Sequence, residues 1–302
     1  MPENDQVRVL MRDGLVREQA DTITVQGRQR TYTAVFPAAG QQRQQAPQSL
    51  LLVLHGSNQS GRKVRAFSGR TFDEMAARGE AVVVYPDAYK GLWNDARASM
   101  QSPARRDGVD DVAFVTTLID HFQQTENLSR VFAVGYSNGG QLVIRLAHEI
   151  PDRLSGVALI GATQPTPDNL VVVDKHLPLP VLLIHGTKDP LVPYAGGVAS
   201  LWGFRPRGTG LSAPASAEYF AGRNGITAPG TSRTLPHHPK SGRTSVTLTS
   251  FEQPGKKPTV LYTVENGGHV IPNPNKKAPA IMGRTTQDIS AAEVIWDFFG
   301  AQ

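Results

Sequence analysis

The chain has 302 residues, of which 39% are apolar and 19% charged, and this is enough apolar material for a sizeable core. It contains no cysteine, which excludes disulfides, cysteine-ligated metals and thiol catalysis. No apolar run reaches the roughly 18 to 20 residues of a membrane span. The first residues, "MPENDQVRVLMRDG", contain no apolar signal segment, so we expect a cytoplasmic protein.

The predicted elements alternate between buried strands and helices along the chain. A hairpin is expected over 22–37. The expected strands are 49–56, 80–87, 130–135, 155–161, 179–186 and 259–269, and the expected helices are 62–79, 109–125, 138–150 and 290–299. Such alternation predicts an α/β fold with a mostly parallel central sheet and helices on both faces. With no repeat and no clear linker, residues 1–302 are interpreted as one domain. Segment 200–258, which is poor in apolar residues, is interpreted as an insertion or lid-like segment.

The net charge of +5 is unevenly distributed. Residues 203–284 hold eleven Lys and Arg and three acids, a balance of +8, which leaves −3 for the rest of the chain. A basic segment fits an anionic substrate, an anionic surface, nucleic acid or a plain solvated surface. If residues 203–258 fold over the carboxyl edge of the sheet, the charges of this segment, with Lys276, Lys277 and Arg284 just after His269, should surround the entrance of a site there.

The stretch "VFAVGYSNGGQLVIRLA" places a serine, framed by glycines, between a buried strand and a helix. Gly135 to Gly139 fit the pattern G-x-S-x-G of a nucleophile elbow, in which a strained turn exposes the Ser137 hydroxyl. A side chain two residues before or after the serine would clash at this sharp turn, so glycine is needed at positions 135 and 139. An ordinary tight turn is the alternative. The position directly between strand and helix favours the elbow.

A serine nucleophile needs a base, and the base needs an acid that orients it. In an α/β fold of this type the chain order is serine, acid, histidine. Asp189, in "LIHGTKDPLVPY", comes three residues after a predicted strand and after Ser137. The rival Asp87 precedes Ser137 in the chain, and Asp174 lies in a weaker apolar run. We therefore expect Asp189 to be the acid.

His269 follows the last predicted strand, in "ENGGH", and is the expected base. His55 and His185 end apolar strands and are interpreted as structural residues bonded to the backbone. The oxyanion of an acyl transfer needs two donors, and we expect the backbone N–H groups of Ser57 and Asn138 to supply them. An ordinary glycine turn is the alternative at Ser57.

Other chemistry has little support in the sequence. The chain has no dinucleotide-binding G-x-G-x-x-G after a strand, no phosphate-binding loop and no H-E-x-x-H metal motif. Asp110 and Asp111 lie at a helix start, where acids complement the helix dipole. No cofactor and no metal are expected.

Seven segments together resemble the polyhydroxybutyrate depolymerase and feruloyl esterase group of α/β-hydrolases, the LpqC-like esterases. They are "LLLVLHGSNQSG", "VVVYPDAYKGLWND", "GVDDVAFVTTLID", "VFAVGYSNGGQLVIRLAHEIPDRLSGVALIGA", "LIHGTKDPLVPYAGG", "ENGGHVIP" and "GRTTQDISAAEVIWDFF". The resemblance covers the chain from about residue 30 onward. It implies a triad of Ser137, Asp189 and His269, with the oxyanion turn at 55–57.

The sequence therefore predicts a serine carboxylic-ester hydrolase that forms an acyl-enzyme and needs no cofactor. Its expected partner is a small or oligomeric ester, with an anionic ester suggested by the basic segment, and neither nucleic acid nor a membrane span is expected. An amide hydrolase of the same fold, or a non-catalytic binding protein on a hydrolase scaffold, are the alternatives. The oligomeric state stays open.

Overall fold

A ten-stranded sheet forms the centre of the molecule in the computed structural model, which describes residues 15–38, 49–200, 203–204 and 206–301. Across the sheet the strands are β1 (Val16–Val25), β2 (Arg28–Pro37), β4 (Ala81–Pro86), β3 (Ser49–Leu54), β5 (Arg130–Tyr136), β6 (Gly156–Ile160), β7 (Val181–Gly186), β12 (Thr259–Glu265), β11 (Ser245–Phe251) and β10 (Thr231–Thr234). The pairings from β4 to β12 are parallel, and those at either edge are antiparallel.

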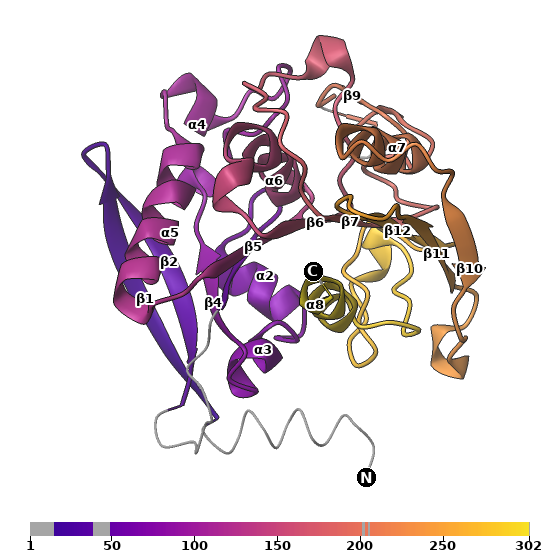
Figure 1. The fold of residues 1–302 in the computed structure, drawn as a ribbon, viewed down its shortest axis with the longest axis horizontal. Helices are drawn as coiled ribbons and strands as arrows, with labels where there is room; N and C mark the ends of the chain where they lie inside the picture. Colours follow the sequence, from indigo (N-terminus) through magenta and orange to yellow (C-terminus); the bar gives the residue numbers. More distant parts are fainter. Residues whose placement is uncertain (1–14, 39–48, 201–202, 205, 302) are drawn as a thin grey trace.

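Helices cover both faces of this sheet. One face carries α5 (Asp111–Glu126), α6 (Asn138–Glu149) and α7 (Ala213–Arg223), and the other carries α2 (Gly61–Phe67), α3 (Asp73–Ala77) and α8 (Ala291–Gly300) (Figure 1). A short α4 (Pro103–Arg106) lies near the start of α5. The predicted fold class is therefore confirmed.

The central parallel strands β3, β4, β6 and β7 are buried along their whole length, because helices cover both faces of the sheet there. In β3, Leu50, Leu52 and Leu54 belong to one core cluster and Leu51 and Val53 to the other, and all five are buried. A strand buried on both faces has no polar side, which explains its unbroken apolar run.

The helix predicted over 62–79 is wrong, because the structure divides it into α2 and α3. Gly69 and Arg70 take positive φ angles of 71° and 63°, so the backbone leaves the helix there. The break is fixed from outside, since Asn273 donates its side-chain amide to the Ser68 carbonyl at 2.6 Å. Nothing in the local apolar spacing signals this contact.

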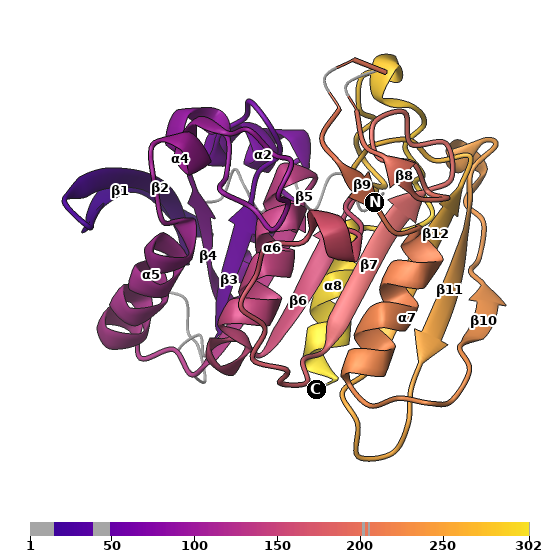
Figure 2. The same ribbon diagram turned by 90° about the horizontal axis from the view of Figure 1, so that it is seen from above.

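Segment 200–258 contributes to the sheet as well as to the loops. Helix α7 packs against β7 and β12, and β11 and β10 extend the sheet beyond β12. A two-stranded ribbon, β8 (Gly197–Val198) with β9 (Thr209–Gly210), lies beyond the carboxyl end of β7 (Figure 2). A lid function for the loop between them stays a prediction.

No helix of the described residues is long and apolar enough to cross a membrane. Residues 1–14, on which the expectation for localisation rests, lie outside the described residues, and localisation stays a prediction.

Candidate active site

Ser137 stands at a strained turn between β5 and α6. It is the residue before the first turn of α6, with φ 55° and ψ −116°, a conformation that a residue with a side chain rarely adopts. A Cβ on Gly135 would lie 2.4 Å from the Gly139 carbonyl oxygen, and one on Gly139 would lie 2.3 Å from that of Leu54. Close backbone approach therefore requires both glycines of the motif.

Asp189 and His269 form a buried hydrogen bond. Asp189 follows β7, and its Oδ1 accepts the N–H groups of Leu191 and Val192, both at 2.8 Å. Its Oδ2 lies 2.6 Å from His269 Nδ1, and the two side chains are 0% and 1% exposed. Because an ionised carboxylate only accepts, Nδ1 donates, and in the neutral imidazole His269 Nε2 is then the acceptor.

The surroundings favour the ionised form of Asp189. Burial raises the pKa of this carboxyl, but His269, His185 and the Val192 N–H together outweigh it and hold the pKa below its usual value. Removal of any of these partners would leave a buried carboxylate with fewer compensating contacts.

His185 lies near the same carboxylate oxygen as His269. Its Nε2 donates to the Val192 carbonyl at 2.9 Å and lies 3.5 Å from Asp189 Oδ2. Burial lowers the pKa of His185, which favours the neutral form of the ring. The prediction that His185 bonds to the backbone is confirmed, but the sequence interpretation missed its contact with Asp189.

The turn after β3 is fixed by a buried His55. Its Nδ1 donates to the Gly56 carbonyl at 2.7 Å, and its Nε2 accepts the Ala88 N–H at 3.0 Å. Both ring nitrogens are therefore occupied, and burial lowers the pKa of the ring. His55 is structural and backbone-bonded, as predicted, and it holds the turn that carries Ser57.

Asn138, the residue after Ser137, is fixed through its side chain. Its amide nitrogen donates to Asp95 at 2.6 Å, and its amide oxygen accepts the Trp93 N–H at 3.0 Å. The Trp93 indole in turn donates to the His55 carbonyl at 2.9 Å. Trp93 and Asp95 thus tie the turn after β3 to the elbow. The sequence interpretation missed this link because both residues lie in a loop without periodicity.

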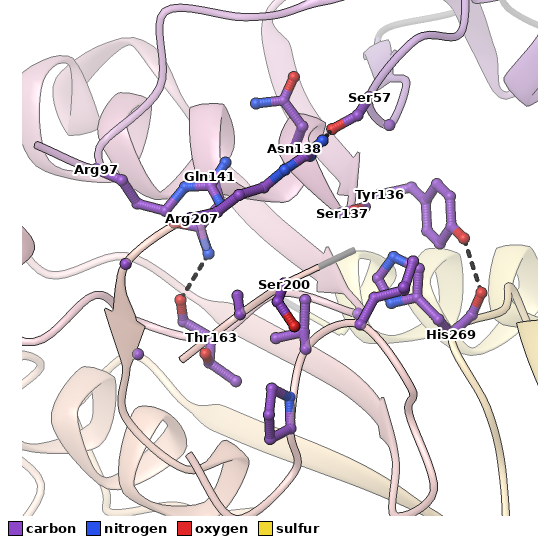
Figure 3. Close-up of a pocket in the computed structure, with 18 of the residues that line it drawn as sticks. Ser57, Arg97, Tyr136, Ser137, Asn138, Gln141, Thr163, Ser200, Arg207 and His269 are labelled. Atoms are coloured by element: carbon purple, nitrogen blue, oxygen red, sulfur yellow. Dashed lines mark hydrogen bonds between the residues drawn. The ribbon is translucent and has the colours of Figure 1, made fainter. Parts of the chain in front are cut away.

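A cavity of about 220 Å³ opens at the carboxyl ends of the parallel strands, and four of the five predicted site residues line it (Figure 3). These four are Ser57, Ser137, Asn138 and His269, while Asp189 lies behind the imidazole. Part of the wall is apolar, formed by Leu191, Val192, Pro193, Tyr136 and Met282. The structure therefore brings the predicted site together.

Two arginines, Arg97 and Arg207, also line the cavity, and the described lining residues include no acid. Arg97 is paired with Asp95 at 2.5 Å. Lys276 and Lys277, expected at the entrance, are absent from the lining, and Lys276 donates instead to the Ala66 carbonyl. Of the basic segment 203–284, Arg207 therefore lines the cavity while Lys276, Lys277 and Arg284 do not, and Arg97 lies outside that segment.

The rival acids have other partners. Asp87 accepts from the Gly61 N–H and the Thr31 hydroxyl, both at 2.7 Å, and Asp174 pairs with Arg223 at 2.7 Å.

The aspartates at the start of α5 serve the fold. Asp110 caps the helix by accepting the Ala113 N–H at 2.8 Å, and Asp111 pairs with Arg30 at 2.7 Å. Within the described ranges, no group of three or more His, Asp or Glu side chains is arranged to hold a metal ion.

Residues 41–201, more than half of the chain, match the family model described as Phospholipase/Carboxylesterase. The chain is 28% identical over 288 residues to NocK of Nocardia uniformis subsp. tsuyamanensis, a protein named as a candidate esterase, with 92% of this chain and 81% of that protein covered. It is 26% identical over 265 residues to a protein named as a candidate feruloyl esterase C from Aspergillus niger, with 84% of this chain and 78% of that protein covered.

Among solved structures, an acetyl xylan esterase from Aspergillus awamori superposes with a TM-score of 0.61 over 94% of this chain and 100% of that one. At 11% identity this likeness shows the shared fold. The predicted resemblance to esterases and feruloyl esterases is confirmed, while the likeness to polyhydroxybutyrate depolymerases stays a prediction. The chain belongs to the phospholipase/carboxylesterase family and is a carboxylesterase-like hydrolase with the α/β-hydrolase fold.

Proposed function

We propose that the protein is a serine carboxylic-ester hydrolase that works through an acyl-enzyme, with Ser137, His269 and Asp189 as its triad. The observation that carries the proposal is the buried 2.6 Å bond between His269 Nδ1 and Asp189, at the cavity where the elbow serine also opens. This arrangement leaves an unprotonated imidazole nitrogen available to a serine hydroxyl, which is what general-base activation needs.

In the acylation step, Ser137 Oγ attacks the ester carbonyl carbon while His269 Nε2 takes the hydroxyl proton. The tetrahedral intermediate then collapses, the bond to the leaving alcohol breaks, and His269 returns the proton to that alcohol. Asp189 keeps the imidazole in the required tautomer and stabilises its charged form without taking the proton. Water repeats the sequence on the acyl-enzyme and releases the acid.

The negative charge on the intermediate needs preorganised donors, and we assign the backbone N–H groups of Asn138 and Ser57. Support comes from the chain of buried bonds from Asp95 through Asn138 and Trp93 to His55, which fixes both turns relative to each other. A donor held in place before reaction costs no reorganisation when charge develops, and each one is worth about 10²- to 10³-fold in rate.

Substrates are proposed to be short. The cavity volume of about 220 Å³ lies below the roughly 300 to 1,000 Å³ of many small-molecule sites. Hydroxybutyrate dimers and feruloyl esters are the classes to test, the first because of the sequence resemblance and the second because of the named relative from Aspergillus niger.

The nucleophile is tested by Ser137→Ala on a panel containing methyl ferulate and a hydroxybutyrate dimer. We expect kcat/KM to fall by about 10⁴ or more in a folded protein. Ser250→Ala, on β11 and outside the cavity lining, is the matched control and should keep the wild-type rate. Near-normal hydrolysis by Ser137→Ala would exclude it as nucleophile, and no hydrolysis of any ester by the wild type would favour a binding role.

The acyl-enzyme is tested by partitioning between water and methanol. Esters that share one acyl group but differ in leaving alcohol should give a constant ratio of methyl ester to free acid, because all of them pass through one intermediate. A ratio that changes with the leaving alcohol would point to direct attack by water.

A further inference from the structure

We propose that Tyr136 is a positioning residue, whose hydroxyl fixes the backbone of the base His269 relative to the nucleophile Ser137. Tyr136 is the last residue of β5 and comes directly before Ser137, and its side chain reaches the segment that carries the base (Figure 3). This proposal rests on the hydrolytic function above, because it assigns a further residue to the same site.

The contact between Tyr136 and His269 is direct. The phenol donates to the main-chain carbonyl of His269 at 2.8 Å, although the two residues are 133 positions apart in the chain. A carbonyl oxygen only accepts, so the hydroxyl must carry its proton. Burial and then the charge of Asp189 raise the pKa of Tyr136, which keeps the phenol protonated. The neighbour of the nucleophile is therefore bonded to the base itself, without an intervening residue.

The ring of Tyr136 is buried and packed on several sides. Phe67 of α2 lies against it with the ring centroids 5.3 Å apart, and the His269 imidazole lies 5.1 Å from it. A Cβ on Gly56 would lie 3.0 Å from the same ring, so the oxyanion turn also packs closely against it. Because a closely packed side chain keeps one rotamer, the phenol hydroxyl has a fixed position.

The other hydrogen bonds of His269 lead to different parts of the molecule. Its N–H donates to the Met282 carbonyl at 2.7 Å, which joins it to a neighbouring loop. Its imidazole is bonded to Asp189, which follows β7. The Tyr136 hydroxyl adds a bond to β5, the strand that leads into the nucleophile. The distance between base and nucleophile therefore depends on this phenol.

Proton transfer requires the Ser137 oxygen and His269 Nε2 to come within hydrogen-bond reach, and a misplacement of about 1 Å costs on the order of 10²-fold in rate. Loss of the phenol hydroxyl leaves the buried His269 carbonyl without this donor, so we expect the segment to shift. Acylation and deacylation both use His269 as the base. The effect should therefore appear in kcat for every ester, whatever its size.

Tyr136→Phe removes the hydroxyl and keeps the ring. We expect kcat for p-nitrophenyl acetate and for methyl ferulate to fall alike by about ten- to a hundred-fold, with KM within about twofold of the wild type. Labelling by a fluorophosphonate should slow by a similar factor, because it uses the same serine and base. A wild-type kcat in folded Tyr136→Phe would overturn the proposal. A change confined to KM, or to the larger ester, would also overturn it, because Tyr136 would then act in substrate binding.

A variant that restores the donor tests the hydrogen bond itself. Replacement of Tyr136 by 4-aminophenylalanine keeps the ring and places an N–H donor where the hydroxyl was. This variant should recover part of the kcat that Tyr136→Phe loses. A kcat no higher than that of Tyr136→Phe would contradict a role for the hydrogen bond.

Tyr219→Phe is the matched control. The Tyr219 hydroxyl also bonds to a histidine, His148, at 2.8 Å, but Tyr219 lies on α7 and outside the cavity lining. Urea unfolding shows whether each variant is folded, and Tyr219→Phe should keep the wild-type kcat. An equal loss of kcat in both variants would mean that any lost tyrosine bond disturbs the site, and it would refute a specific role for Tyr136.

The failure of this proposal is distinguishable from that of the hydrolytic mechanism. Ser137→Ala should abolish hydrolysis of both test esters. If it does so while Tyr136→Phe keeps the wild-type kcat, the mechanism stands and only the positioning role is lost.

Discussion

Gly139→Ala is expected to lower both stability and the rate of ester hydrolysis, because the added methyl group has no room at the start of α6. Gly139 is the second residue of α6, and an added Cβ would meet the Leu54 carbonyl oxygen at 2.3 Å and that of His55 at 2.6 Å. Ordinary contacts begin at about 3.4 Å, so the start of α6 and strand β3 must separate by roughly 1 Å. Overpacking of this size costs about 1 to 3 kcal/mol of stability.

The same displacement moves Ser137 relative to the oxyanion turn, and a misplacement of about 1 Å costs on the order of 10²-fold in rate. Gly222→Ala is the matched control, because Gly222 lies on α7 with nothing within 4 Å of its Cβ position. That change should stabilise the protein by about 0.5 to 1 kcal/mol. Urea unfolding and ester hydrolysis are measured on both variants. A Gly139→Ala protein with wild-type kcat/KM and stability would refute the close-approach reasoning.

Three further changes test the electrostatics. Burial and then Glu293 raise the pKa of Glu74 to about 7, so the stability from its protonated form is present at low pH and lost as pH rises through that value. In urea unfolding at pH 8, the free energy of unfolding of Glu74→Gln should therefore exceed that of the wild type by roughly 1 to 2 kcal/mol, a figure reduced for solvent screening, and at pH 5 the difference should be small. Equal differences at both pH values would contradict this. Asp189→Asn should lower kcat by about 10⁴ with the fold intact by circular dichroism, because the tautomer of the base is no longer fixed; a loss below tenfold counts against the assignment. Arg30→Met removes the guanidinium that lies 2.7 Å from the buried Asp111 carboxylate and should lower the free energy of unfolding by about 3 to 5 kcal/mol. Adding Asp111→Asn should restore part of this stability, because the unpaired buried charge is then removed. A double variant no more stable than Arg30→Met would argue against a charge effect.

The location of the site could be predicted because it follows from the order of parallel strands. Ser137, Asp189 and His269 each come after a strand of the parallel set, and the carboxyl ends of such strands meet at one edge. Glycines at the elbow and the position of each residue in the chain were enough to choose among several acids and histidines. The hydrogen bond between Asp189 and His269 agrees with that choice.

What the sequence did not predict lies in loops and long-range contacts. Arg207 reaches Ser57 across 150 positions of sequence, and no periodic pattern encodes such a contact. Asp95 was missed for the same reason, although it holds Asn138 in place. The break between α2 and α3 depends on a bond from Asn273, more than 200 residues away, so the local apolar pattern favoured one continuous helix.

The most direct test of the central claim is the site of covalent labelling. A fluorophosphonate ester should react with the purified protein once per chain, and mass spectrometry of the peptides should place the added mass on Ser137. Prior incubation with an ester substrate should slow the labelling, and Ser137→Ala should not be labelled. Unreactive wild-type protein, or added mass on another residue, would contradict the proposed serine hydrolase mechanism.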